Sequence, residues 1–210
     1  MSTAGSSRRS FLTTTAALAV ALPLAGAAPA AARPRQTPTP PKVGEEFTWR
    51  LDAPGTGLRV RESDASVDLS GQVHLRVAEQ DSADPWNLKL KVTDFRLTGQ
   101  DRQGLGEIEL RHDDSAKTPD SLLRSISQFP PTWEQTLFLA FTLRIENPPE
   151  KLDEPLVLTT KNPGKLLGRL NNFPPNGDAY KLENPVDLVL QDSGETIASI
   201  QKFPVKVGGL

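Results

Sequence analysis

The sequence predicts a mainly β protein, an antiparallel β-sandwich or open barrel that also carries two short helices. Three observations support this fold class: runs of alternating apolar and polar residues, turn residues between those runs, and a segment that occurs twice. The alternation is typical of strands with one dry and one wet face. Short strands separated by turns in this way are typical of sandwiches and barrels.

The repeated segment occupies residues 118–131 and 162–175, which read TPDSLLRSISQFPP and NPGKLLGRLNNFPP. Aligned without gaps, the copies share Leu122 with Leu166, Leu123 with Leu167, and the whole Phe-Pro-Pro ending. Ordinary residue usage predicts roughly one chance identity in a window of this length. The repeat is therefore treated as real.

Each copy is predicted to form a short helix. Thr118 and Asn162 are good N-cap residues, and each precedes a proline at the first helical position. The apolar residues that follow lie on one helical face, and the Phe-Pro step ends the helix near Phe129 or Phe173. A helix of about ten residues needs an apolar support. The pattern predicts a strand, helix, Phe-Pro-Pro, strand unit, whose helix either plugs a sandwich end or grips a ligand.

The other elements are predicted to be strands, at residues 47–51, 67–77, 88–97, 107–112, 136–145, 156–158, 186–190, 196–200 and 203–207. The segment 136–145 is apolar on both faces, which predicts a central strand. Residues 53–57, which read APGTG, are expected to end the first strand. The polar, glycine-rich residues 99–106 are expected to join two strands as a hairpin.

The N-terminal residues 1–32 are interpreted as a targeting segment. Residues 7–12, SRRSFL, resemble the twin-arginine export motif, and a mild apolar stretch of about a dozen residues follows, shorter than the roughly 20 that span a bilayer. Ala30-Ala31-Ala32 fits the cleavage pattern. The expected organisation is a signal peptide at 1–32, a Pro/Thr-rich linker at 33–44, and one β-sandwich domain at 45–210. The protein is then secreted or held in the cell envelope, with no integral membrane segment after signal removal.

The chain contains no cysteine, so a secreted domain must be held together by its core alone. Such export, as the resemblance implies, carries proteins already folded in the cytoplasm. The chain has 24 basic and 26 acidic residues, without a basic block, which argues against nucleic acid and anionic membranes as partners. With its Phe-Pro-Pro turns, the segment 45–207 resembles uncharacterised secreted proteins of high-GC bacteria. That resemblance implies no activity and no site residues.

Two tryptophans are the best candidates for ligand contact. Trp86 follows Asp84-Pro85, and Trp133 follows Phe129-Pro130-Pro131. A proline pins the backbone, and a tryptophan presented in this way is a good anchor for a ligand. Alternatively, both rings cover the ends of the sandwich. We expect Trp86 to be exposed and Trp133 to be buried beside Phe129, with Trp49 buried in its alternating strand.

A metal site is the second candidate. His112, Asp113 and Asp114 form the one sequence cluster of three potential metal ligands, and calcium could use them together with Asp120 or backbone carbonyls. A strand end that enters a polar turn explains the same residues. The other histidine, His74, is expected on the wet face of its strand with no partner.

The sequence favours a non-catalytic protein. It contains no G-x-S-x-G elbow and no lysine-bearing phosphate loop, and no catalytic residue or cofactor is predicted. The interpretation is a secreted binding or accessory protein for an unknown extracellular ligand or protein partner. Two alternatives remain open. One is a carrier of a lipid or other apolar ligand, with a cavity lined by the Leu122/Leu123 and Leu166/Leu167 faces. The other is a hydrolase that uses paired carboxylates.

Overall fold

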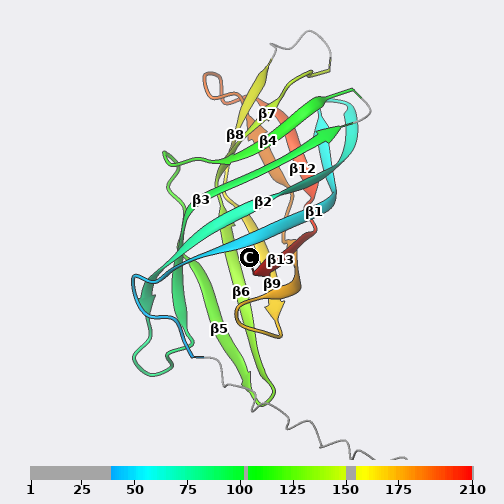
Figure 1. Ribbon diagram of the computed structural model, residues 1–210. Coiled ribbons are helices and arrows are strands. Elements are labelled where there is room, and N and C mark those ends of the chain that lie inside the picture. The colour runs from blue at the N-terminus through cyan, green and yellow to red at the C-terminus, as the bar shows by residue number, and fades with distance from the viewer. Residues whose placement is uncertain (1–38, 102–103, 150–154, 210) are drawn as a thin grey trace, which may run out of the picture. The chain divides into compact units, whose positions relative to one another are not determined.

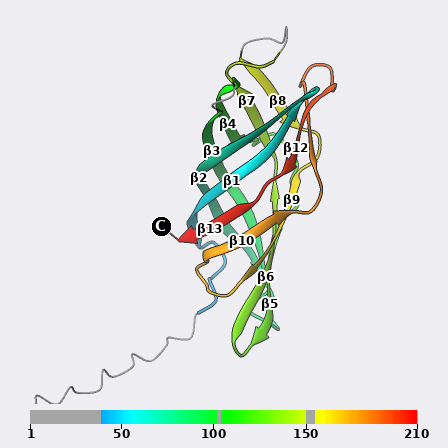
Figure 2. The ribbon, with the colours of Figure 1, turned by 90° about the vertical axis from the view of Figure 1, so that its right-hand side faces the viewer.

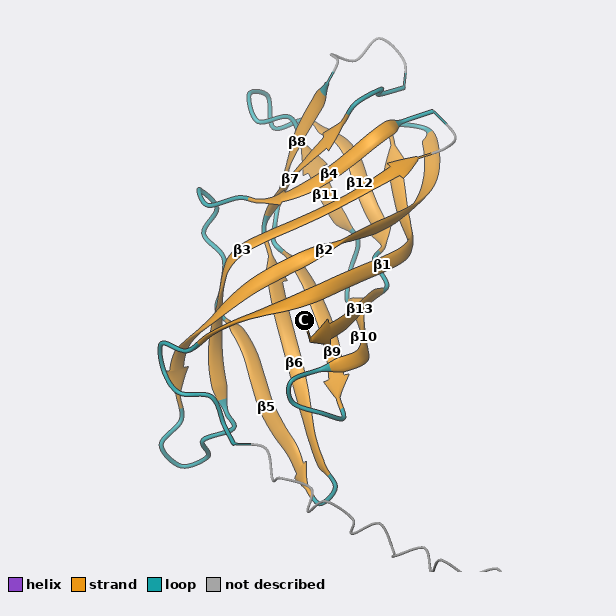
Figure 3. Cartoon of the chain, viewed as in Figure 1, coloured by secondary structure: helices purple, strands orange, loops and turns teal. Residues whose placement is uncertain are grey.

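The structure is a computed structural model that describes residues 39–101, 104–149 and 155–209. These residues form strands and loops, without a helix (Figure 3). Within the same ranges there is accordingly no helix that could cross a membrane. The expected signal peptide, and the first half of the expected linker, lie outside the described residues.

Thirteen strands make up the described part of the chain. They are β1 (Glu46–Val60), β2 (Ser63–Gln80), β3 (Leu88–Asp101), β4 (Gly106–His112), β5 (Ser121–Gln128), β6 (Pro131–Leu139), β7 (Phe141–Ile145), β8 (Leu156–Thr160), β9 (Gly164–Leu170), β10 (Asn176–Leu182), β11 (Val186–Val189), β12 (Thr196–Lys202) and β13 (Val205–Gly209).

The strands form one antiparallel sheet that closes on itself. Its order is β12-β11-β8-β7-β4-β3-β2-β1-β13-β10-β9-β6-β5, and the end strands return to its middle because β12 also pairs with β1 and β5 with β3. The expected sandwich of two separate sheets is therefore not supported. Hydrogen bonds instead run continuously from strand to strand, which removes most of the exposed sheet edges.

The closed sheet has two levels. The long strands β1, β2 and β3 run through both levels. Going around the sheet from β3 to β1, each further place is filled by two shorter strands, one in each level. These pairs are β4 and β5, β7 and β6, β8 and β9, β11 and β10, and β12 and β13. We call the set of β4, β7, β8, β11 and β12 the upper level and the set of β5, β6, β9, β10 and β13 the lower level, as they lie in Figure 1. Figure 2 shows the same division from the side.

Strand alternation puts the apolar side chains inside the closed sheet. In β1, Trp49, Leu51 and Ala53 are each at most 1% exposed, while the residues between them face outward. The expected break at residues 53–57 is wrong. The pairing of β1 with β2 shifts register between Ala53 and Thr56, and the strand continues to Val60. A bulge can absorb the Pro-Gly sequence without ending a strand.

The two predicted helices are also wrong, because both segments are strands. β5 and β9 lie on either side of β6 and pair with it throughout. A short amphipathic run does not distinguish a helix from a strand, and a helix this short has little stability of its own. Ladder hydrogen bonds to β6, with burial of one face of each strand, therefore decide the conformation. Asn176–Leu182, for which the sequence analysis expects no element, is the strand β10.

The two copies of the repeat pair with β6 in registers that differ by one residue from their sequence alignment. Leu122 and Leu167 both pair with Thr136, whereas the sequence aligns Leu122 with Leu166. Because side chains alternate along a strand, this slip places aligned residues on opposite faces. Leu123 is buried, whereas its sequence counterpart Leu167 is 36% exposed. The two copies are therefore similar in sequence but not equivalent in packing.

Both Phe-Pro-Pro sequences form turns at the lower level, yet they differ in shape. In the first copy β5 continues to Gln128, which pairs directly with Pro131, and Phe129 at the tip is 95% exposed. In the second copy β9 ends at Leu170 and β10 begins only at Asn176. The longer loop lets Phe173 turn back against the core.

Candidate functional site

Aromatic rings gather at the lower level of the closed sheet. We call Phe47, Trp49, Trp86, Trp133 and Phe173 the aromatic cluster. The ring of Phe173 is its hub, with centroid distances of 5.4 Å to Trp86, 6.1 Å to Phe47, and 6.3 Å to both Trp49 and Trp133. Phe47 stacks on Trp49 at 5.2 Å. Three of the rings belong to strands, Phe47 and Trp49 to β1 and Trp133 to β6. The other two belong to loops, Trp86 to the loop before β3 and Phe173 to the loop between β9 and β10.

The structure brings the two predicted ligand-binding tryptophans together. Trp86 and Trp133 are 4.8 Å apart between ring centroids, and their planes are tilted by 51°. Trp133 is 2% exposed and Trp49 is 1% exposed, as expected. Two details of the prediction are wrong. Trp86 is half-buried against the core rather than exposed, and Trp133 packs beside Phe173 rather than beside the exposed Phe129.

Local hydrogen bonds hold the two loops that carry Trp86 and Phe173. The carboxylate of Asp84 accepts from the backbone N–H of Trp86 at 3.0 Å. In the other loop, the carboxylate of Asp178 accepts from the backbone N–H groups of Asn171 and Asn176, each at 3.1 Å. Short aspartate side chains commonly stabilise turns in this way. These bonds stabilise the two loops whose rings, Trp86 and Phe173, pack against the core and against each other.

Two residues beyond Trp133 along β6 lies a polar pair, which we call the polar floor: Gln135 on β6 and Tyr180 on β10. The Tyr180 hydroxyl donates to Oε1 of Gln135, across the intervening strand β9. Gly168 makes this reach possible, since a Cβ at its position would lie only 2.5 Å from the Tyr180 ring. Burial, and secondarily the nearby Asp178 carboxylate, raises the pKa of Tyr180 well above its ordinary value.

Two donors on the inward face of β6 have no acceptor among the described residues. Gln135 is fully buried and its Nε2 makes no hydrogen bond, and the indole Nε1 of the buried Trp133 makes none either. An unsatisfied buried donor costs about 1–3 kcal/mol. Native structures contain few such groups, and each calls for an explanation such as a ligand or an ordered water. The lower interior therefore offers hydrogen bonds that the protein itself does not use.

A crevice of about 720 Å³ opens beside the cluster, where β5 leaves β3. The pairing of these strands covers only Leu88–Leu90 with Ser121–Leu123. Beyond it, the crevice is lined by Asn87, which follows Trp86, and by Ser125, which pairs with Trp133. Its volume falls in the range of roughly 300–1,000 Å³ typical of small-molecule sites.

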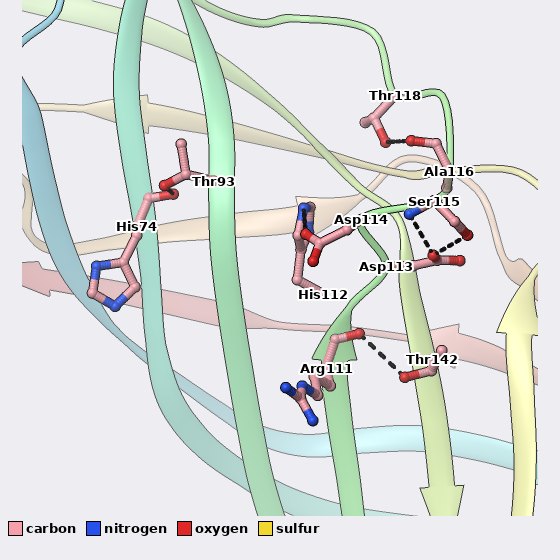
Figure 4. A network of polar contacts seen from close by, with 10 residues as sticks. All are labelled: His74, Thr93, Arg111, His112, Asp113, Asp114, Ser115, Ala116, Thr118 and Thr142. Carbon is pink, nitrogen blue, oxygen red and sulfur yellow. Dashed lines mark hydrogen bonds and ion pairs between the residues drawn. The ribbon is translucent and has the colours of Figure 1, made fainter.

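The residues expected to bind a metal do not converge. The ring of His112 faces Asp114, with Nε2 3.3 Å from the carboxylate, while the Asp113 carboxylate accepts from the backbone and hydroxyl of Ser115 (Figure 4). Among the residues with described positions, no group of three His, Cys, Asp or Glu side chains is arranged to hold a metal ion. The Asp113 contacts are those of an ordinary polar turn after β4.

His74 has a partner that sequence reasoning did not foresee. It lies on the outer face of β2, away from His112 (Figure 4), and its Nδ1 is 2.9 Å from the Thr48 hydroxyl. Both residues line a shallow outer groove of about 390 Å³, together with Asp94. The Asp94 position pairs with His74 across the strands, yet the structure shows no ion pair between them within the described part of the chain.

The two buried carboxylates both accept hydrogen bonds from turns. Asp101 accepts from the backbone N–H of Leu105 at 2.9 Å, and Asp178 holds the loop that carries Phe173. In the described residues these two are the acidic side chains with less than a tenth of their surface exposed. Asp101 ends β3 and Asp178 lies on β10, two strands that do not pair with each other.

Sequence reasoning identified Trp86 and Trp133 but missed Phe173, Gln135 and Tyr180. Phe173 was assigned to a helix end, and nothing in the pattern around Gln135 distinguishes it from the exposed polar residues near it. The one available signal was alternation: Gln135 shares its parity with Trp133 and Leu137, and so belongs to the inward face of β6.

Comparison with known proteins identifies the fold but no family. No protein-family model matches the chain, and no curated protein matches it. Its structure is similar to that of DynF from the dynemicin biosynthesis pathway of Micromonospora chersina, with a TM-score of 0.64 and 15% sequence identity over 81% of this chain and 82% of that one. At this identity the likeness concerns the fold alone.

Proposed function

We propose that this protein is a secreted, non-catalytic binding protein whose aromatic cluster holds a small apolar compound containing rings. The observation that carries the proposal is the meeting of Trp86, Trp133 and Phe173 at one end of a closed sheet. Aromatic side chains offer flat apolar faces that stack on ligand rings, and each such pair contributes about 0.5–1.5 kcal/mol beyond the area that it buries.

In this proposal the ligand enters from the crevice, past the loops that carry Trp86 and Phe173. Trp86 and Phe173 are only partly buried and belong to loops, whereas Trp49 and Trp133 belong to strands and are almost fully buried. Loop residues move at lower cost than strand residues in a closed ladder. Trp49 and Trp133 thus form the fixed wall of the site, and the rings of Trp86 and Phe173 move to admit the ligand.

A carrier of an apolar ligand is the related alternative, and the crevice favours it because its volume suits a small molecule. The crevice is lined by the first leucine pair, Leu122 and Leu123, but not by the second, Leu166 and Leu167. Leu123 and Leu166 face the interior and are at most 1% exposed, whereas Leu167 faces outward. A carrier would therefore use the aromatic cluster and the crevice, which takes one wall from the first copy of the repeat, residues 122–126.

Fluorescence titration of residues 39–210 with the uncharged dye N-phenyl-1-naphthylamine tests the proposal. A dye bound at the cluster quenches tryptophan emission by energy transfer, with saturation at one dye per chain. The repeat supplies a matched pair of variants. Phe173→Ala, which removes the hub ring, is expected to raise the dissociation constant about tenfold, equivalent to about 1.4 kcal/mol.

Phe129→Ala is the control, since Phe129 occupies the same position of the same Phe-Pro-Pro sequence but is 95% exposed at the other turn. It is expected to leave the dissociation constant unchanged. Equal losses in both variants would place the dye on the outer surface and would contradict the proposal. Absence of saturable binding to the parent domain would contradict it as well.

Export is part of the same proposal and rests on sequence. The SRRSFL motif and the cleavage pattern at Ala30-Ala31-Ala32 support the twin-arginine route, and the absence of cysteine is compatible with folding before export. The ligand or partner is accordingly sought outside the cytoplasm, among small molecules of the cell envelope or the medium.

A further inference from the structure

Resting on the proposed function, we infer that the ligand is an uncharged, ring-bearing compound with a carbonyl oxygen. That oxygen accepts hydrogen bonds from the two unused donors of the lower interior, Gln135 Nε2 and Trp133 Nε1. The inference names the chemical class of the ligand, which the aromatic cluster alone leaves open.

The positions of the two donors support this assignment. Trp133 and Gln135 are two residues apart on β6 and both face the interior, so their Cα atoms are separated by roughly 7 Å. Gln135 cannot turn its amide elsewhere, because Oε1 already accepts from the Tyr180 hydroxyl. Its N–H groups are therefore held inside, next to the tryptophan that forms the fixed wall of the site.

The charge of the interior argues for a neutral ligand. Among the described residues, no lysine, arginine or histidine is buried. Lys89 and Arg124 line the crevice but are exposed, so a carboxylate or phosphate placed against Gln135 and Trp133 would have no buried cationic partner. The nearest buried charge belongs to the Asp178 carboxylate, two residues from Tyr180 on β10. Burying an anion without a partner is strongly unfavourable, whereas a carbonyl that receives hydrogen bonds is readily accommodated.

Three probes of the same ring shape test this inference on the mature chain: fluorene, 9-fluorenone and fluorene-9-carboxylate. Fluorenone adds a carbonyl to fluorene, and the carboxylate adds a negative charge. We expect fluorenone to bind about tenfold more tightly than fluorene, and the carboxylate to bind no more tightly than fluorene. Isothermal titration gives the three dissociation constants.

A paired substitution assigns the preference to the polar floor. Gln135→Leu together with Tyr180→Phe removes both partners of the internal hydrogen bond, so neither is left unsatisfied, and such replacements are often tolerated. In this variant the preference for fluorenone should fall, because only the Trp133 indole N–H remains to donate to its carbonyl. Gln72→Leu, on the outer face of β2, is the matched control and should keep the tenfold preference.

Trp133 provides a second signal. The chain has three tryptophans, so a ¹⁵N-labelled sample has three indole N–H resonances. We expect the Trp133 resonance to move downfield with fluorenone and to move less with fluorene.

The possible outcomes separate the two proposals. If fluorenone and fluorene bind equally to the parent protein, the ring site stands and the carbonyl inference is overturned; a trapped water that already satisfies the donors would give this result. Tighter binding of the carboxylate would also overturn it. If none of the three probes binds, the proposed function itself fails.

Discussion

Tyr180 and its neighbours show how single residues shape the interior. A tyrosine ring could not lie across β9 if Gly168 carried a side chain, and the hydroxyl could not be buried without Gln135 to accept from it. One glycine, one tyrosine and one glutamine on three adjacent strands thus create the polar floor.

The raised pKa of Tyr180 predicts a specific alkaline behaviour. The folded state holds the proton more tightly than the unfolded state, so this contribution to stability is complete below the ordinary tyrosine pKa of about 10 and is lost as pH rises above it. Since the chain has one tyrosine, tyrosinate absorbance reports this group alone. We expect no ionisation until the protein unfolds, whereas the urea-unfolded chain should titrate near pH 10.

Tyr180→Phe is the control for that experiment, and it should remove this part of the decline in stability at high pH. A reversible tyrosine ionisation near pH 10 with the tertiary structure intact would show that the hydroxyl is accessible. The polar floor as described would then be wrong.

Gly168→Ala should destabilise the protein by about 1–3 kcal/mol, the usual cost of forcing a methyl group into a packed interior. The reason is the 2.5 Å approach of the added Cβ to the Tyr180 ring. Gly208→Ala is the matched control on a lower-level strand, because a Cβ there meets nothing within 4 Å, and it should stay within about 0.5 kcal/mol. Urea unfolding measures both. Similar effects at the two positions would argue against the close packing of Tyr180.

At the scale of elements, the two copies of the repeat supply two strands of the lower level, β5 and β9, and the turns that follow them. Both copies supply a strand that flanks β6, followed by a Phe-Pro-Pro turn, yet they are offset by one residue and their turns differ in length. One turn leaves its phenylalanine in solvent, and the other places it at the hub of the aromatic cluster. The same short sequence therefore yields two different surfaces.

The offset predicts which leucines stabilise the fold. Leu123→Ala and Leu166→Ala should each cost about 2–5 kcal/mol, as truncations of buried leucines do. Leu167→Ala should cost less than about 1 kcal/mol, since its side chain is 36% exposed on the outer face of β9. Denaturant unfolding of the three variants measures the difference. The helical interpretation would instead predict equal losses for Leu123 and Leu167, so that result would restore it.

At the scale of the whole molecule, closure of the sheet replaces disulfides as the main constraint. The long strands β1, β2 and β3 connect both levels, and the ladder returns to them from either side. A chain without cysteine gains its stability from the buried interior alone, and the closed ladder leaves few strand edges for aggregation. Such a domain is suited to an export route that moves folded proteins.

Export through that route makes a prediction of its own. Replacing Arg8 and Arg9 together by lysine should abolish secretion, because the paired arginines are the central feature of the motif. Immunoblotting of medium and cell fractions measures the distribution, and circular dichroism of the purified variant should show the same β structure as the parent. Normal secretion of the double variant would remove the support for this localisation.

The sequence by itself determined the β class and most of the strand positions, and it singled out two tryptophans whose rings meet in the structure. In segments such as 88–97, apolar and polar residues alternate, so one face of the strand must be buried in any sheet that contains it. The structure shows this alternation of buried and exposed residues in β3. The burial of Trp49 followed from the same parity. These features depend on neighbours along the chain, which is why they could be predicted.

Tertiary structure alone decided the rest. Residues 121–128 and 164–170 became strands because β6 lies between them, and that pairing joins residues far apart in the sequence. The same long-range pairing set the one-residue offset that turns Leu123 inward and Leu167 outward. It also brought Gln135, Gly168 and Tyr180 to one level, where a glycine leaves room for a ring and a hydroxyl finds its acceptor. No local pattern encodes these contacts, because each depends on which strands become neighbours when the sheet closes.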